Sequence, residues 1–382
     1  TVTAQQEGKT PEQVAMEYHK LNSDSIERMG ISFDLFSHTH TEEHAEVALS
    51  ILKKLDDNGY IEPRISEEPY DPIANQFLPD RYVEGTCPHC NYDSARGDQC
   101  DNCGKTLDSK ELINPRSKLN PDAKIEFKET EHLFFKLSEF RDTLLEWLSE
   151  GKDHWRPSVI NFTKNWLKEG LIDRAVTRDL EWGIEIPREG YENKRMYVWF
   201  EAVMGYYSAS IHWAKNQGKP DEWKKWWESD DSEHYYFMAK DNIPFHTIIW
   251  PAMLSGCGYK LPYDVPANEY LLLDSSQFSK SRRHAIWIPD YLDRYDPELL
   301  RFYLASIMPE QKDANFTWED YVTRINTELI GNYGNLMYRV MSFAKKNFSE
   351  GLSSQNPVNA ELNGKTKEAF DKVSKALEGC KF

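Results

Sequence analysis

Four cysteines in two pairs are the densest chemical signal in the chain. Cys87 and Cys90 form one C-x2-C pair, and Cys100 and Cys103 form a second pair after nine intervening residues. Two such pairs on tight turns can hold four thiolates tetrahedrally around Zn²⁺, with Zn–S distances of about 2.3 Å. Four protein ligands leave no open position, so the spacing predicts a structural zinc site. Disulfides are the alternative, which a reducing compartment disfavours.

A second candidate is the basic segment 277–283, which reads QFSKSRR and follows an apolar run ending at Leu273. Within it Lys280 lies between Ser279 and Ser281, and two arginines follow. A lysine on a mobile loop can meet phosphate oxygens as they develop charge. Such strings are also common on solvated surfaces, so this loop does not by itself establish a catalytic site.

Composition limits the kinds of protein that these residues can serve. The chain has 382 residues, 40% of them hydrophobic, and 46 Lys and Arg against 63 Asp and Glu give a net charge of −17. The length predicts about two to four folded domains. The negative charge argues against coating nucleic acid by bulk electrostatics, so any RNA contact must be local. Neither a membrane span nor a signal peptide is recognisable, and we expect a cytoplasmic location.

The N-terminal half predicts alternating helices and strands, which is typical of an α/β fold. A Thr-Pro-x-Gln cap favours a helix from Thr10 to about Gly30, and a second helix is expected from Thr41 to Gly59. Between them, alternation at 31–35 predicts a strand. From Tyr60 to about Pro115 the periodicity is lost, so this stretch is interpreted as an insertion and not as core.

The α/β pattern returns in the C-terminal half. Helices are expected at 138–150 and 158–169, the latter capped by Ser158 and ended by Gly170, and strands at 197–200, 234–238 and 269–273. From Thr317 apolar residues keep helical spacing for roughly 30 residues, and a further helix carries Phe370, Val373 and Leu377. These last segments predict the start of a helical bundle.

Five segments, taken in order, make the chain resemble the class I aminoacyl-tRNA synthetases, specifically the methionyl-tRNA synthetase family of archaeal and eukaryotic style. They are AQQEGKTPEQ at 4–13, FLPDRYVEGTCPHC at 77–90, YVWFEAVMGYYS at 197–208, AKDNIPFH at 239–246 with WPAML at 250–254, and FSKSR at 278–282. The resemblance covers essentially the whole chain. It implies an incomplete Rossmann-type parallel sheet and the activation of L-methionine with ATP and Mg²⁺ to methionyl-adenylate, followed by transfer to tRNA(Met).

The resemblance also implies roles for particular residues. Lys280 would stabilise the transition state at the α-phosphate, with Ser279 and Ser281 shaping its loop. Lys240 would reach the nucleotide, and Asp241 would hold the substrate ammonium. The pocket for the uncharged methionine side chain would be formed by Trp199, Ala202, Tyr206, His246 and Trp250. Outside this context, the tryptophans and the histidine would be read as ordinary core residues, and Asp241 as a helix cap.

The same resemblance implies a division of the chain into successive regions. They are part of the catalytic domain at 1–41, a connective insertion at 42–196 with a zinc knuckle at 82–106, the second half of the catalytic domain at 197–270, a loop-motif region at 271–316 and the start of an anticodon-binding helical domain at 317–382. Selection of methionine by shape in an apolar cavity distinguishes a missing methylene by only about 1–3 kcal/mol, so close analogues should compete.

Several residues depart from the family pattern. Gln277 replaces the first lysine of the loop motif, and Ala239 and Glu201 stand where Gly and Asp are expected. The H-I-G-H segment that grips the ATP phosphates in this family is absent, and the His38-Thr39-His40 string has the wrong neighbours to replace it. We therefore expect that this chain alone does not complete aminoacylation, and robust pyrophosphate exchange would overturn that expectation.

Three other functions remain compatible with the sequence. A cysteinyl or branched-chain synthetase is the nearest enzymatic alternative, and thermal-shift assays with the competing amino acids would separate them. A zinc-ribbon RNA-binding module is a second, although no basic cluster accompanies Cys87–Cys103. A catalytically inactive paralogue acting as a scaffold is the third.

Overall fold

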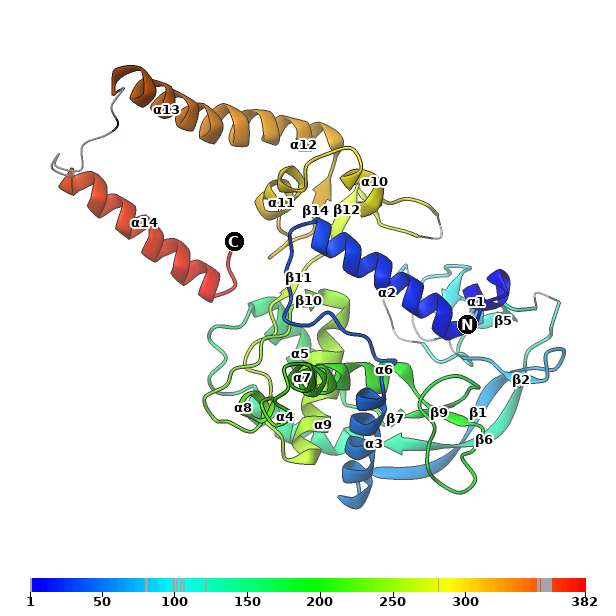
Figure 1. The fold of residues 1–382 in the computed structure, drawn as a ribbon. Coiled ribbons are helices and arrows are strands. Elements are labelled where there is room, and N and C mark those ends of the chain that lie inside the picture. Colours follow the sequence, from blue (N-terminus) through cyan, green and yellow to red (C-terminus); the bar gives the residue numbers. More distant parts are fainter. Residues whose placement is uncertain are drawn as a thin grey trace.

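The computed structural model describes residues 2–79, 82–97, 100, 102–103, 105, 107–120, 122–280, 282–348, 351 and 359–382. Among these, the helical cluster in the middle of Figure 1 surrounds the largest hydrophobic core. It is formed mainly by α3 (Glu42–Asp57), α4 (Arg141–Trp147), α5 (Pro157–Glu169), α7 (Gly205–Asn216) and α9 (Trp250–Cys257). None of the helices described is long and apolar enough to cross a membrane.

Short parallel strands lie at the edge of this core, as an α/β fold requires. β10 (Met238–Ala239) pairs with β11 (Ala267–Asn268), and the pairing is parallel. Next along the chain, β12 (Leu271–Leu273) pairs in parallel with β14 (Ala314–Phe316) and antiparallel with β13 (Ser276–Gln277). The predicted α/β class is therefore confirmed.

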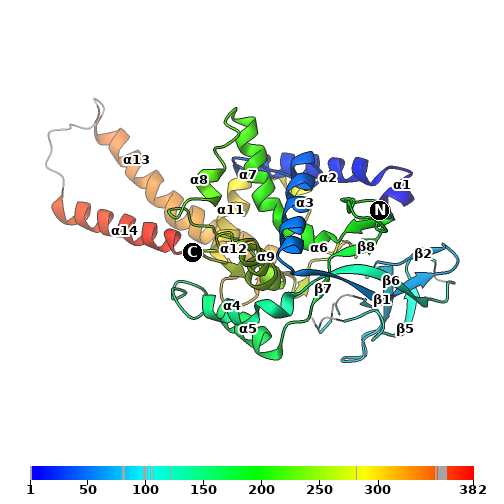
Figure 2. The same cartoon turned by 90° about the horizontal axis from the view of Figure 1, so that it is seen from below.

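A long pair of antiparallel strands occupies part of the stretch that was interpreted as an insertion without a core. β1 (Ile61–Asp71) and β6 (Glu126–Phe135) are paired from Ile61↔Phe135 to Tyr70↔Glu126, with β2 (Gln76–Phe77) and β7 (Arg174–Ala175) at the edges. Its inner end is buried in the main core through Ile61 and Phe135, whereas its outer end projects to one side (Figure 2). The prediction that this stretch contributes nothing to a core was therefore wrong at Ile61.

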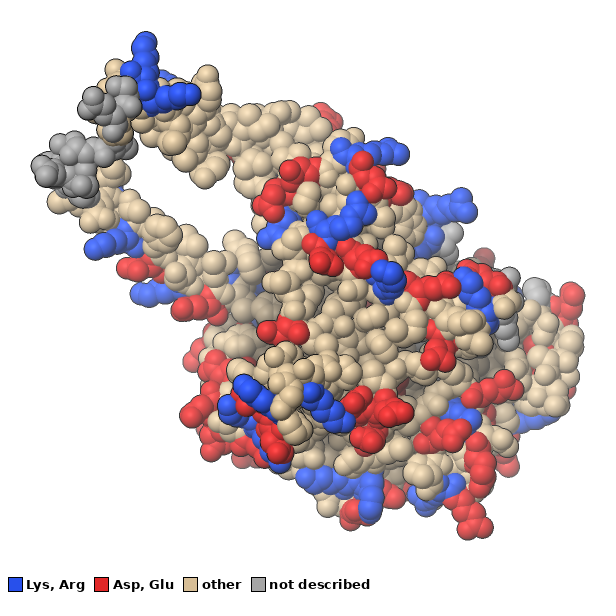
Figure 3. All heavy atoms as spheres, viewed as in Figure 1, with Lys and Arg blue, Asp and Glu red and all other residues tan. Residues whose placement is uncertain are grey.

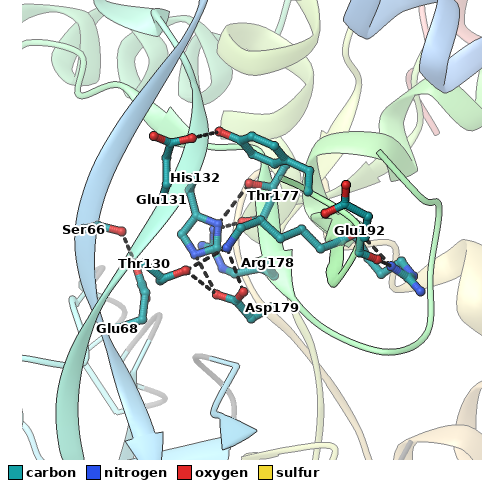
Figure 4. A network of polar contacts seen from close by, with 12 residues as sticks. Ser66, Glu68, Thr130, Glu131, His132, Thr177, Arg178, Asp179 and Glu192 are labelled. Atoms are coloured by element: carbon teal, nitrogen blue, oxygen red, sulfur yellow. Dashed lines mark hydrogen bonds and ion pairs between the residues drawn. The ribbon is translucent and has the colours of Figure 1, made fainter. Parts of the chain in front are cut away.

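The hairpin made by β8 (Thr177–Asp179) and β9 (Lys194–Met196) is joined to β6 by a polar network (Figure 4). Lys194 Nζ donates to Asp179 Oδ1 and to Thr130 Oγ1, both at 2.7 Å, and Thr130 Oγ1 donates to Asp179 Oδ2 at 3.0 Å. His132 is completely buried, with Nδ1 3.0 Å from Thr177 Oγ1 and Nε2 3.3 Å from Asp179 Oδ2. These polar contacts add to the apolar packing of Leu133, Val176 and Met196 in the main core.

A small module beyond the outer end of the β1–β6 pair carries the four cysteines. Its sheet has the order β4-β3-β5, with β3 at Val83–Thr86, β4 at Ala95–Arg96 and β5 at Ile113–Ser117. The module's own core is minor, and two of its buried residues are Cys87 and Cys100. So few apolar residues need a further constraint to hold the fold.

A second core holds the elements around the basic loop. It joins α10 (Ile288–Leu292), α11 (Pro297–Ser306), β12 and β14, and Met29 reaches it from the end of α2 (Pro11–Arg28). Arg28 Nη2 lies 2.7 Å from Asp293 Oδ1, which fixes α2 against α10. α1 (Val2–Glu7) precedes α2.

A helical arm extends from this second core (Figures 1 and 2). α12 (Trp318–Arg324) is followed by π-helical turns at Ile325–Gly334, by α13 (Asn335–Asn347) and, further along, by α14 (Ala360–Glu378). Asp320 N donates to Thr317 Oγ1 at 3.1 Å, which confirms the predicted cap. The expected helical run of that length is therefore present.

Four local predictions were wrong. Of the strand expected at 234–238, only Met238 belongs to a strand, and Tyr235 makes an isolated bridge to Asp264. Residues 31–35 form no strand, because no neighbouring strand pairs with them, and Ile31 and Phe33 are exposed. The strand expected at 197–200 is instead a short helix, α6 (Val198–Glu201). Ser158 does not cap α5: the N-cap is Arg156 and Pro157 occupies the first turn, while Gly170 ends the helix at φ 100° as expected.

Candidate functional site

The turn that follows β10 carries the first pair of candidate residues. Ala239 is still extended, and residues Lys240–Asn242 then form a single 3₁₀ turn. Asp241 is exposed on this turn, where Asn242 Nδ2 donates to its Oδ1 at 3.2 Å. The carboxylate thus follows the carboxyl end of a parallel strand, which is where open α/β sheets bind their ligands.

A π-helical turn at Phe245–Ile249 comes next and leads into α9. Pro251 explains this geometry in part, since proline has no N–H to donate to the Thr247 carbonyl in an α-helical pattern. The turn places His246 in the interior at 5% exposure. Single π turns are frequent at functional sites.

His246 is held as a neutral imidazole of defined tautomer. Nδ1 lies 2.9 Å from the carbonyl oxygen of Asn242, which can only accept, so Nδ1 carries the proton. Burial lowers the pKa of His246, although the hydrogen bond to Asn242 opposes this. Nε2 therefore has a free lone pair, and the Tyr206 hydroxyl donates to it at 2.7 Å.

Aromatic rings from two distant parts of the sequence meet around His246. The Tyr206 ring packs edge-on against Tyr236 with centroids 4.9 Å apart, and the half-buried Trp199 ring lies 5.3 Å from that of Phe245. Ala202 is half-buried in the 3₁₀ turn between α6 and α7. The structure therefore joins the segments 197–208 and 236–250 at one place.

Trp250 and Tyr236 form the buried back of this cluster. Trp250 is completely buried, and its Nε1 donates to the Tyr236 hydroxyl at 3.0 Å. Sequence reasoning did not select Tyr236, because an aromatic residue in an apolar run at 234–238 looked like ordinary strand. The available signal was that a buried tyrosine needs a hydrogen-bond partner for its hydroxyl group.

A buried histidine fixes the turn that carries Ala202. His44 on α3 lies with Nε2 2.5 Å from Glu201 Oε2 and Nδ1 2.9 Å from Ser208 Oγ. These contacts tie both ends of the 201–208 turn to α3. Glu201, which departs from the family pattern, thus has a structural partner on another helix.

Lys240 has partners that the sequence did not reveal. Its Nζ donates to Glu269 Oε2 and Asp313 Oδ1, both at 2.7 Å, and lies 4.3 Å from the centroid of the Tyr270 ring. Burial lowers the pKa of Lys240, but the hydrogen bonds to Asp313 and Glu269 outweigh burial and raise it. The ammonium is therefore charged and already paired.

Lys280 lies at the tip of a small hairpin in the basic loop. Ser279 N donates to the His284 carbonyl at 2.9 Å and His284 N to the Ser279 carbonyl at 3.0 Å. Ser281 lies outside the described residues. Lys280 and Asp241 lie on different elements, and among the described residues no hydrogen bond or ion pair joins them.

The four cysteines of the small module converge. Their sulfur atoms all lie within 4.8 Å of one another, with Cys87 and Cys103 3.9 Å apart and Cys90 and Cys100 3.6 Å apart. Four ligands at about 2.3 Å in a tetrahedron require sulfur separations of about 3.8 Å, so the cluster fits a metal ion such as zinc. The amide of Asn102 donates to Cys90 and lowers the pKa of that thiol to about 6, which favours a thiolate.

Comparison with solved structures identifies the fold. The crystal structure of Mycobacterium tuberculosis methionyl-tRNA synthetase bound by methionyl-adenylate matches 98% of this chain and 68% of that one, with a TM-score of 0.75 and 22% identity. The family model described as tRNA synthetases class I (M) matches residues 1–341. The fold and the family model together define a class I aminoacyl-tRNA synthetase.

Similarity in sequence to known proteins identifies the family within this class. The methionine–tRNA ligase of Dehalococcoides mccartyi is 51% identical over all of this chain and 69% of the relative. Those of Thermomicrobium roseum and Thermoplasma acidophilum are 50% and 45% identical over 99% of the chain. The chain belongs to the methionyl-tRNA synthetase family, and it spans 64–69% of the length of these three relatives.

Proposed function

We propose that the chain is the amino-acid-activating part of a methionine–tRNA ligase. Within the whole protein it would bind L-methionine for activation with ATP and Mg²⁺ to methionyl-adenylate, and the whole protein would transfer the methionyl group to tRNA(Met) in the cytoplasm. The observation that carries this proposal is the aromatic cluster around the neutral His246, directly beside the Asp241 turn.

The pocket chemistry suits methionine. Trp199, Ala202, Tyr206 and His246 would offer aromatic and apolar surface, with the completely buried Trp250 behind them, and none of them brings a full charge, since His246 is neutral. A polarisable thioether makes favourable contacts with aromatic rings. Asp241, exposed on the adjacent turn, would bind the α-ammonium group of the amino acid. The two ends of the substrate would therefore be recognised by different physical means.

The activation step needs cationic groups near the phosphates. A carboxylate oxygen of methionine attacks the α-phosphorus of ATP, and the bond from that phosphorus to the leaving pyrophosphate breaks. Lys280 on its loop would stabilise the developing charge, and Ser279 and Ser281 would shape the loop. Lys240 would meet the nucleotide only by exchanging Glu269 or Asp313 for a phosphate oxygen. Charge removal at Lys280 should therefore affect the rate more than methionine binding.

The contact with tRNA would be confined to particular surfaces. In the view of Figure 3, acidic side chains are frequent over the main body, whereas much of the α12–α13 arm shows uncharged surface with basic side chains near its far end. With a net charge of −17, general attraction of the phosphate backbone is weak. A local, shape-dependent contact agrees better with this distribution.

A structural Zn²⁺ in the four-cysteine cluster completes the proposal. Cys87, Cys90, Cys100 and Cys103 would be its ligands, and the ion would supply the constraint that the minor core of the module lacks. Metal analysis of the purified chain should give one zinc per chain, and Cys100→Ser should lose it. Full zinc content in Cys100→Ser would contradict this assignment.

Thermal-shift measurement with different amino acids tests the function. Methionine should raise the melting temperature of the chain, whereas cysteine, valine and leucine at the same concentration should raise it less. An equal or larger shift with leucine or valine would favour a branched-chain synthetase. Binding of tRNA without any response to methionine would favour an RNA-binding module.

A further inference from the structure

Lys240 lies where two small sheets, one parallel and one mixed, meet. Residues 267–273 form one extended segment that pairs first with β10, at Met238↔Ala267, and then with β14, at Leu271↔Ala314. In this segment the pairing with β10 ends just before Glu269, and the pairing with β14 begins just after Tyr270. Lys240 contacts Glu269 and Tyr270, the two residues at which the pairing changes from β10 to β14.

Its ammonium group connects three chain segments. Glu269 belongs to the middle segment, and Asp313 directly precedes β14; each carboxylate lies 2.7 Å from Lys240 Nζ. Asp313 Oδ1 also accepts the backbone N–H of Tyr270 at 2.9 Å, and Lys240 lies over the Tyr270 ring. The side chain of Lys240 is only 31% exposed, so solvent screens these contacts incompletely.

Residues of β14 hold the turn between β12 and β13 by hydrogen bonds. Asn315 Oδ1 accepts the N–H of Ser275 at 2.7 Å, and the Phe316 carbonyl accepts that of Asp274 at 3.0 Å. Asp274 and Ser275 both have positive φ, 47° and 64°, so this tight turn depends on its anchoring contacts.

The hairpin in turn holds the loop that carries Lys280. His284 Nε2 lies 2.9 Å from the Leu273 carbonyl oxygen, and His284 pairs with Ser279 through two backbone hydrogen bonds. A continuous series of contacts thus runs from Lys240 through β14 and the hairpin to Lys280.

We infer that Lys240 is a positioning residue: its pairing with Asp313 sets β14 against β12 and thereby orders the loop of Lys280 relative to the turn of Asp241. The inference rests on the proposed function only in that Asp241 and Lys280 would act on one substrate. The contacts themselves belong to this chain whatever it binds.

Hydrogen–deuterium exchange of the intact chain tests the inference. Asp313→Asn keeps an oxygen for the Tyr270 N–H but removes the charge that pairs with Lys240. Amides within 273–284 should exchange about three- to tenfold faster, whereas those of α9 should not change. Asp221→Asn is the matched control, because it removes an exposed carboxylate 2.7 Å from Lys224 that is remote from the loop in sequence.

Substitutions at Lys240 separate positioning from a general structural role. Lys240→Met should reproduce the faster exchange, Lys240→Arg should restore slow exchange, and Lys240→Met with Asp313→Asn should add little to either change alone. If Asp313→Asn does not fold, Lys240→Met and Lys240→Arg test the same expectation.

Three results would overturn the inference: unchanged exchange at 273–284, an equal effect of Asp221→Asn, or faster exchange throughout the protein. Methionine binding by the unchanged chain is measured in parallel. Its failure would contradict the proposed function and leave the exchange result standing.

Discussion

The protonation of single side chains decides what the aromatic cluster can bind. His246 donates from Nδ1 to a backbone carbonyl and accepts the Tyr206 hydroxyl at Nε2, so both ring nitrogens are satisfied without a positive charge. The depressed pKa of His246, caused by burial, maintains this state at neutral pH. An uncharged lining is what a thioether side chain requires.

Removing the Tyr206 hydroxyl tests this arrangement. Tyr206→Phe leaves the lone pair of His246 Nε2 without its donor, and methionine should bind about five- to tenfold more weakly, equivalent to about 1–1.4 kcal/mol. Tyr18→Phe, at an exposed position on α2, is the matched control and should bind normally. Calorimetric titration measures both, and equal affinity in the two variants would argue against the role of this hydroxyl.

His132 makes a separate contribution to stability against acid. Burial, assisted by the charges of Lys194 and Arg178, lowers its pKa to about 3 from an ordinary value of 6.5. The unfolded chain takes up the proton below about pH 6.5 and the folded chain does not until about pH 3. Stability present above pH 6.5 is therefore lost progressively as the pH falls through that window.

Urea unfolding at pH 7 and pH 5.5 measures this loss. The unchanged chain should lose about 1 kcal/mol more than His132→Gln between the two values, since one pKa unit corresponds to about 1.4 kcal/mol. His40→Gln, at an exposed position, should lose as much as the unchanged chain. The account of His132 fails if its variant is just as sensitive to acid.

At the scale of the elements, α9 packs closely against α3 at Gly256. A Cβ added at Gly256 would lie 2.7 Å from Leu55 Cδ2 and 3.0 Å from Phe140 Cζ. The glycine therefore permits the approach of α9 to α3 and to the 3₁₀ turn at Leu137–Phe140. This approach also fixes the end of the helix that begins with Trp250, behind the pocket.

Gly256→Ala should accordingly lower the free energy of unfolding by about 1–3 kcal/mol through overpacking. Gly364→Ala on α14 has nothing within 4 Å of the new Cβ and should instead raise stability by about 0.5–1 kcal/mol, as alanine favours a helix. Urea titration of both variants distinguishes the two mechanisms. A neutral Gly256→Ala would show that α9 can shift at little cost.

Helix starts could be predicted because their signals are local. The capping box of Thr10 and Gln13 and the caps at Thr41 and Thr317 are present as expected. The strands at 31–35 and 197–200 could not, because a strand requires a partner that the local pattern does not specify. Tertiary packing decided both cases.

The candidate site was predictable to a similar extent. The family pattern placed Asp241, Tyr206 and His246 in one neighbourhood, and the structure joins the last two by a hydrogen bond. The pairing of Lys240 with Asp313 was not predictable, because 73 residues separate them and an acidic residue before a short strand is unremarkable. Tyr236 was missed because it lies in an apolar run, and the partner of its hydroxyl, Trp250, is on another element.

On the scale of the whole molecule, two cores share the proposed chemistry. The aromatic cluster around His246 is joined to the main core through Tyr236 and Trp250, and the basic loop lies between Leu273 and Ile286 of the second core. α2 is fixed to the second core through Arg28 and Asp293, while Lys240 joins the two cores at the sheet junction. The ion pairs of Lys240 are therefore one polar connection between the elements of the aromatic cluster and those of the basic loop.

The central claim is that Asp241 and the aromatic pocket together bind methionine, and calorimetric titration of L-methionine into the chain tests it most directly. The account predicts saturable binding to the unchanged chain and to the control Asp221→Asn. Asp241→Asn should bind at least about tenfold more weakly, because a hydrogen bond to a charged group contributes about 1.5–3 kcal/mol. Equal affinity of Asp241→Asn, or no binding of methionine to the unchanged chain, would contradict the claim.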